Sequence, residues 1–416
     1  MSRSSIVFAA LLALPLAAGC PRSRTPGSLS TDGGLRTDSG RPRTDAGPGC
    51  VPVAETCNRA DDDCDGLVDE GLRERVPVTD LDVLFLVDNS NSMTEEQESF
   101  ARELPRLVRV LATGDLDGDG AGDFTPPRSL HFGVVTSDMG TGGFTVPTCS
   151  EPNFGDDGVL RTQGNTSIAG CMASYPNFLE FRADSGATPE PFAQELRCVA
   201  QLGTGGCGFE QQLEAVLKAV TPSTSGISFG MGTTGNGDAE NAGFLRPDAM
   251  LAVVVLTDEE DCSAADSELF NPSSAVYSGN LNLRCFSYPM AVHPIERYVD
   301  GLLALKSDPS QVFFAVIAGI PPDLAESSAT YDAILADDRM QEQVDPADPN
   351  RLRPSCNVPG RGLAFPPRRL VRVAQQLESV GASATLGSIC QADYSAVTTR
   401  LLAALADATA TVETCR

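Results

Sequence analysis

From residue 80 onward, apolar segments typical of strands alternate with segments in which apolar residues recur at helical spacing. Residues 82–87 contain a continuous apolar run, which is typical of a strand buried on both faces, and further strands are predicted at 130–136, 250–256 and 312–320. Apolar residues at helical spacing predict helices at 94–112, which Pro105 is expected to interrupt, and at 209–220, 295–305, 370–380 and 394–406. This alternation predicts an α/β fold with a doubly wound, mostly parallel sheet flanked by helices.

Two long, glycine-rich segments separate the predicted elements, at residues 141–205 and 221–248. Long loops in a compact domain usually have a function. The first segment contains Cys149, Cys171 and Cys198, so disulfides are expected to staple it. We therefore expect disulfide-stapled insertions around the sheet.

The N-terminal 19 residues have the pattern of a signal peptide. Arg3 precedes a short apolar run, and the run ends in small residues before Cys20. This resembles the lipobox of bacterial lipoproteins, which implies acylation of Cys20 and, because Pro21 follows, an outer-membrane location in the cell envelope. Plain secretion is the alternative. Residues 20–49 contain almost no large apolar residues and predict a flexible, lipidated tether.

Composition narrows the classes of partner. The net charge is −26 and tryptophan is absent, which argues against nucleic acid and against binding of anionic lipid by surface charge. Contact with a membrane is expected through a lipid anchor only. Thirteen cysteines suit an oxidising compartment, and twelve remain for pairing if Cys20 is acylated.

Short oxygen-bearing residues follow the first predicted strand. Asp88, Ser90 and Ser92 stand where an open α/β sheet binds ligands, outside the carboxyl end of a strand. This Asp-x-Ser-x-Ser resembles the metal-ion-dependent adhesion site of von Willebrand factor A domains, and the resemblance covers residues 80–410. It implies a second aspartate, Asp258 after the strand 250–256, and a threonine, for which Thr204 is the candidate. The resemblance implies Mg²⁺ or Mn²⁺ there, although Glu259 stands where the family often has glycine.

A second acidic segment follows the first predicted helix. Its carboxylates occupy positions 1, 3, 5 and 9 of a calcium loop, glycine occupies position 6 and a backbone carbonyl is available at position 7. Pro126 replaces the usual glutamate at position 12, so the segment resembles the loops of dockerins and thrombospondin repeats. We predict a structural Ca²⁺ site. Its predicted ligands are Asp115, Asp117, Asp119, Ala121 and Asp123.

Residues 50–71 form a module dense in cysteine and aspartate. It resembles a metal-binding motif of surface proteins from Gram-negative bacteria, of which the best-known member binds copper. Copper(II) prefers imidazole, and His131 and His293 are far away in the sequence, so Ca²⁺ is the preferred interpretation. Disulfides of Cys50, Cys57 and Cys64 are favoured over a zinc–thiolate site. The predicted ligands are Asp61, Asp63, Asp65, Asp69 and Glu70.

These patterns together predict a cell-envelope lipoprotein that binds a protein partner through a divalent metal. The family resemblance implies that an acidic residue of the partner completes the coordination. The alternative is a structural envelope protein that calcium and disulfides stabilise and whose adhesion site is inactive. No enzyme activity is expected, because the chain has no Gly-Lys-Ser/Thr phosphate loop and neither His131 nor His293 lies in a catalytic motif.

Overall fold

The computed structural model describes residues 51–57, 60–65, 68–359 and 362–415. Contacts divide the chain into residues 1–45 and 46–416, and the description here concerns the second unit. The predicted signal peptide, the acylation site at Cys20 and the tether lie outside the described residues.

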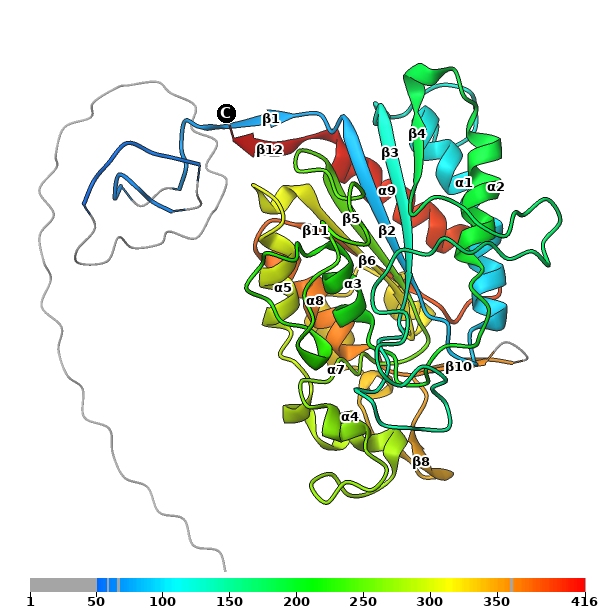
Figure 1. Cartoon of the computed structure of the whole chain (residues 1–416). Coiled ribbons are helices and arrows are strands. Elements are labelled where there is room, and N and C mark those ends of the chain that lie inside the picture. Colours follow the sequence, from blue (N-terminus) through cyan, green and yellow to red (C-terminus); the bar gives the residue numbers. More distant parts are fainter. Residues whose placement is uncertain (1–50, 58–59, 66–67, 360–361, 416) are drawn as a thin grey trace, which may run out of the picture. The chain divides into compact units, whose positions relative to one another are not determined.

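A six-stranded sheet forms the centre of the fold, with the strand order β11-β6-β5-β2-β3-β4 (Figure 1). Neighbouring strands are parallel except at one edge, where β4 runs antiparallel to β3. The prediction of a mixed α/β fold with a mostly parallel sheet is therefore confirmed. The strands are β2 (Asp80–Val87), β3 (Ser129–Thr136), β4 (Leu179–Arg182), β5 (Met250–Leu256), β6 (Val312–Ala318) and β11 (Ser383–Ser388).

Helices pack on both faces of the sheet, which explains why its central strands are apolar on both sides. On β2, Phe85 belongs to one core cluster and Leu84 to the other. The first cluster includes residues of α1 (Thr94–Thr113), α2 (Pro189–Ala200) and α9 (Ser395–Ala410). The second includes residues of α3 (Gln212–Val220), α5 (Glu296–Leu303) and α8 (Arg368–Ser379).

Smaller elements surround this core. A two-stranded antiparallel pair joins β1 (Arg73–Val76) to β12 (Val412–Cys415), so the segment before β2 lies beside the segment after α9. The remaining strands are β7 (Val344–Asp345), β8 (Asp348–Leu352), β9 (Cys356–Val358) and β10 (Gly362–Ala364). The remaining α-helices are α4 (Arg284–Ser287), α6 (Pro322–Ala325) and α7 (Tyr331–Ala336).

Helix α1 continues through Pro105, so the predicted interruption was wrong. Pro105 lies on the exposed side of the helix, whereas Phe100, Leu104 and Leu107 are buried against the sheet. This apolar packing offsets the backbone hydrogen bond that proline removes. The helix ends at Gly114, whose φ of 77° is the left-handed conformation that glycine adopts at low cost.

The first insertion is more ordered than its glycine content suggested, because it contains β4 and α2. Disulfides staple it, as predicted, through Cys171–Cys198 and through Cys149–Cys207, which ties it to the loop before α3. Two further disulfides are Cys262–Cys285 and Cys356–Cys390. In the N-terminal module, Cys57 and Cys64 are disulfide-bonded as well.

Candidate metal sites

The carboxyl ends of β2 and β5 bring Asp88 and Asp258 to the same edge of the sheet. The two strands are parallel, and Val87 is in register with Leu256. The backbone N–H of Asp88 donates to the carbonyl of Leu256 at 2.9 Å, so the ladder reaches the first residue of the predicted motif. Asp88 and Asp258 are distant in sequence, but the loops that contain them leave the same edge of the sheet side by side.

The Asp88 carboxylate is fully buried and accepts hydrogen bonds from three other residues. Its Oδ1 accepts from the backbone N–H of Ser90 at 2.8 Å and from the Ser137 hydroxyl at 3.1 Å. Its Oδ2 accepts from the Thr257 hydroxyl at 2.6 Å. Burial raises the pKa of Asp88, and these donors oppose that shift. Ser137 and Thr257 both follow predicted strands, but no sequence motif marks them as part of the site.

The two serines of the motif lie side by side, with their hydroxyl oxygens 3.1 Å apart. Ser90 is buried, whereas Ser92 is exposed and its hydroxyl also interacts with the Asp258 carboxylate. The structure therefore brings Asp88, Ser90, Ser92 and Asp258 together, and their oxygens are the donor type that Mg²⁺ and Mn²⁺ prefer.

The surroundings of the Asp258 carboxylate show whether these residues fit a cation. Its side chain is only 3% exposed, and within the described part of the chain its Oδ1 is buried without a hydrogen-bond donor. A buried carboxylate oxygen without a donor costs about 1–3 kcal/mol or more. Burial first, and then the charge of Asp88, raises the pKa of Asp258 well above its usual value. A cation would supply the missing partner, so the donor set fits one.

Two more carboxyl groups adjoin this site. Ser90, Ser92, Glu210 and Glu259 line one hollow of about 340 Å³. Burial and the charge of Asp88 raise the pKa of Glu210, and burial and the charge of Asp258 raise that of Glu259. Sequence reasoning noted Glu259 only as a departure from the family pattern, and it did not assign Glu210. The position of Glu210 at the start of the predicted helix 209–220 was the available signal.

Thr204 lies apart from the other predicted ligands. It lines a different hollow, together with Gln97 and Arg102, whereas Ser90 and Ser92 line the first one. Gln97 lies between the Asp88 loop and the loop that contains Thr204. Its Nε2 donates to the backbone carbonyls of Asp88 at 2.7 Å and of Gly203 at 3.0 Å. In the described residues, Thr204 is thus not grouped with the motif, and its role as a ligand stays a prediction.

The predicted calcium loop gathers three of its four aspartates. Carboxylate oxygens of Asp115, Asp117 and Asp123 lie within 4.8 Å of one another. Gly118 and Gly120 adopt positive φ, and their backbone N–H groups donate to the Asp115 carboxylate at 2.6 and 3.0 Å. Outside this triad, Asp119 accepts from the N–H of Ala121 at 2.7 Å. The triad could hold a hard cation; Ca²⁺ and the roles of Asp119 and Ala121 stay predictions.

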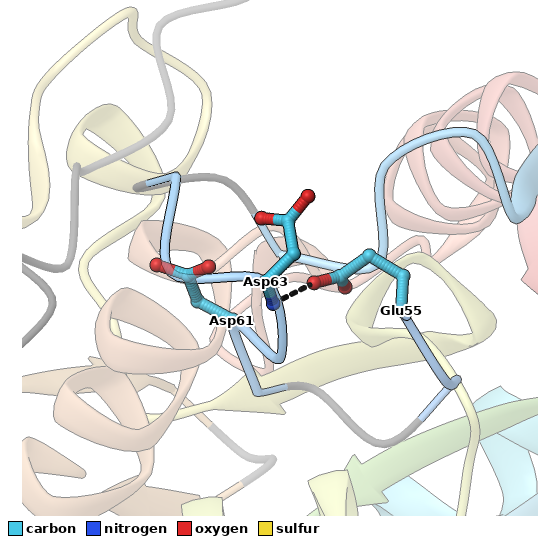
Figure 2. Close-up of side chains that lie close together, drawn as sticks. All are labelled: Glu55, Asp61 and Asp63. Carbon is cyan, nitrogen blue, oxygen red and sulfur yellow. Dashed lines mark hydrogen bonds between the residues drawn. The ribbon is translucent and has the colours of Figure 1, made fainter. Parts of the chain in front are cut away.

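The N-terminal module contains two carboxylate triads that share Asp63. One consists of Glu55, Asp61 and Asp63 (Figure 2), and the other of Asp63, Asp65 and Glu70. Sequence reasoning missed Glu55 as a candidate ligand. Glu55 also orders the module, since its two carboxylate oxygens accept from the backbone N–H groups of Asp63 and Asp69, both at 2.8 Å.

Asp69 differs from the other predicted ligands of this module. Its carboxylate is 1% exposed and forms an ion pair with Arg73. The described triads do not include it. Arg73 also pairs with Asp308, which precedes β6. The position of Asp69 therefore favours a structural role in joining the module to β1.

Comparisons with known proteins assign no family. No family model and no curated protein matches the chain. Two solved structures of proximal thread matrix protein 1 from the mussel byssus resemble it weakly. One is 14% identical with a TM-score of 0.27, and the match covers 59% of this chain and 39% of that protein. The other is 10% identical with a TM-score of 0.32 and covers 83% and 50%, so this chain spans half or less of either.

No helix among the described residues is both long enough and apolar enough to cross a membrane.

Proposed function

We propose that this chain is a cell-envelope lipoprotein whose von Willebrand factor A-like domain binds a protein partner through a divalent metal. Asp88, Ser90, Ser92 and Asp258 would hold Mg²⁺ or Mn²⁺. The observation that carries the proposal is the buried Oδ1 of Asp258, which has no donor among the described residues and lies beside three other oxygen-bearing side chains. In this arrangement, a carboxylate of the partner would take a remaining coordination position.

The sheet topology supports this assignment. The chain passes from β2 to β3 and β4 on one side, and then crosses to β5, β6 and β11 on the other. Doubly wound sheets bind ligands where the strand order reverses, outside the carboxyl ends of the strands. That point lies between β2 and β5, and these are the strands that Asp88 and Asp258 follow.

The second candidate function is a structural envelope protein with an inactive adhesion site. The proximity of Glu210 and Glu259 favours it. If Asp88, Asp258 and both glutamates were ionised, four negative charges would surround one divalent ion and would repel an acidic partner. The adhesion proposal therefore requires that Glu210 and Glu259 stay protonated or that they bind a cation of their own.

Metal-dependent capture separates the two functions. The full-length protein would be immobilised and incubated with solubilised envelope proteins in Mg²⁺ or Mn²⁺, and then in chelator. We expect capture that chelator abolishes and that Ser92→Ala reduces strongly, because Ser92 is exposed and its loss costs the fold little. Ser379→Ala, at the exposed end of α8, is the matched control. Equal capture in chelator, or by Ser92→Ala, contradicts capture through this metal site, and the absence of any capture supports the structural alternative.

A further inference from the structure

A second hollow carries positive charge on an otherwise acidic protein. It has a volume of about 610 Å³ and lies between the first turns of α1, the end of α2 and the loop that contains Thr204. Its charged lining residues are Arg102, Arg197 and Glu98, so its net charge is +1 in a chain with a net charge of −26. The two arginines come from different helices, and both line this hollow.

The guanidinium of Arg197 lacks a partner in the described part of the chain. Its Nε is buried and has no hydrogen-bond acceptor, and neither Arg197 nor Arg102 forms a close ion pair with a described carboxylate. The charge of Arg102 does help to lower the pKa of Asp393. Arg102 uses one nitrogen to donate to the Ser99 hydroxyl at 2.8 Å. Because nearly all buried donors in proteins are satisfied, a guanidinium that combines a buried nitrogen without an acceptor with no other described partner indicates a missing ligand.

Three other arginines also have a buried Nε without an acceptor among the described residues, namely Arg161, Arg284 and Arg400. Each of these uses another guanidinium nitrogen, to Asp156, to the backbone carbonyl of Leu269 and to Glu326 respectively, whereas the described residues offer the Arg197 side chain no such partner. Arg182 is exposed, yet its Nε and Nη2 donate to the Asp184 carboxylate, each at 3.2 Å. The last turn of α2 accounts for a cation at position 197, since helix carbonyls favour positive charge there. It does not supply an acceptor for Nε.

We propose that this hollow binds a carboxylate group, held by Arg197 and Arg102. The planar fork of a guanidinium matches the two oxygens of a carboxylate, and a charge-assisted bond is stronger than a neutral one. Glu98 at the rim disfavours a doubly charged anion such as phosphate more than a singly charged carboxylate. The uncharged lining residues add polar groups that suit a hydrophilic ligand. They include Thr94, Asn165, Ser167, Gln201 and Thr204.

The hollow adjoins the proposed metal site. Gln97 lines it and also donates to the backbone carbonyl of Asp88. Thr94, another lining residue, is the first residue of α1 and follows Ser92 by two residues. A partner on the metal would therefore cover the hollow, and we infer that it presents two acidic residues, one for each position. This second step rests on the proposed function, whereas carboxylate binding in the hollow does not.

The test uses glutarate as the probe and the full-length protein with ¹⁵N-labelled arginine. The Nε–H signal of Arg197 is identified by its absence from Arg197→Gln. We expect glutarate to shift this signal, and we expect Arg197→Gln to bind glutarate about tenfold more weakly. Arg182→Gln is the matched control and should bind as the wild type does. A signal that glutarate does not move, or equal binding by Arg197→Gln, overturns the proposal, as does tighter binding of inorganic phosphate.

Two variants distinguish a failure of this inference from a failure of the proposed function. Asp258→Asn should lose metal-dependent capture of the partner and keep glutarate binding. Arg197→Gln should keep the stabilisation by Mg²⁺ and capture the partner more weakly. If Arg197→Gln captures the partner as the wild type does, recognition at two points is wrong. If Asp258→Asn still captures it, the metal-site function is wrong while the carboxylate site stands.

Discussion

Replacing Asp258 by asparagine should have opposite effects on stability with and without a metal. Asparagine keeps the size of the side chain and removes its charge. Without a metal, the buried Asp258 carboxylate faces the charge of Asp88 and has one oxygen without a donor in the described residues. The variant should therefore be as stable as the wild type or more stable in chelator. With a metal bound, the same carboxylate becomes a ligand, and its loss should weaken binding.

The magnitude follows from mass action. At a metal concentration a hundredfold above the dissociation constant, binding to the native state adds about 2.7 kcal/mol to the free energy of unfolding. If the variant binds a hundredfold more weakly, the same concentration adds only about 0.4 kcal/mol. Unfolding entropy scales with chain length, so for about 370 residues these gains correspond to melting shifts of roughly 3–4 °C and well under 1 °C.

Thermal melts followed by circular dichroism in EGTA, with and without Mg²⁺, measure both effects, because EGTA removes Ca²⁺ from the acidic loops and leaves Mg²⁺. Asp248→Asn is the control, since Asp248 is exposed and lies before the other end of β5. Asp88→Ala is a poorer probe, because it would leave three donors around a fully buried position without their acceptor and would cost stability by itself. The same Mg²⁺ shift in Asp258→Asn and in the wild type would refute a metal ligand at this position.

Three further predictions concern other parts of the chain. Chelation of Ca²⁺ should lower the melting temperature by a few degrees, and Asp117→Ala should remove most of that response; a response that is unchanged in the variant contradicts a calcium loop. Cys20→Ala should move the protein from the membrane fraction to the soluble fraction, and equal distribution of both forms contradicts acylation. Burial lowers the pKa of Lys306 from 10.5 to about 8. Its proton is therefore lost first in the folded state, and the free energy of unfolding should rise by up to roughly 3 kcal/mol between pH 8 and 10.5. Denaturant titrations should show that Lys306→Met lacks this rise, and an equal slope in both proteins would contradict it.

The sequence predicted the elements that are buried on both faces. The strand 250–256 was predicted with its observed bounds, because β5 is apolar at every position. Strand β11 (Ser383–Ser388) was missed, because most of its residues are only half-buried and Ser, Thr and Gly break the apolar run. Helix α2 was not predicted although Phe192, Leu196 and Val199 have helical spacing, because it lies within the glycine-rich segment 141–205, which was predicted to be a loop.

The residues of the candidate site could be predicted where they belong to a short motif or directly follow a recognisable strand. Asp88, Ser90 and Ser92 are close in sequence, and Asp258 follows a recognisable strand. The donors Ser137 and Thr257 contact Asp88 because β3 and β5 flank β2. Local sequence patterns do not predict the order of strands in a sheet. Glu210 approaches the site through the path of a long loop, which periodicity does not describe.

The pairing of β1 with β12 affects how the protein would respond to mechanical load. β12 follows α9 in the chain and β2 follows β1, so tension on the chain before Arg73 would pass along β1 directly into β2. The opposite end of β2 carries the Asp88 loop, and parallel ladders to β3 and β5 flank the strand along its length. A pull between the chain before Arg73 and a ligand held at that loop would run along the strand and load both ladders in shear. Many backbone hydrogen bonds would then have to break together before the central strand could slide.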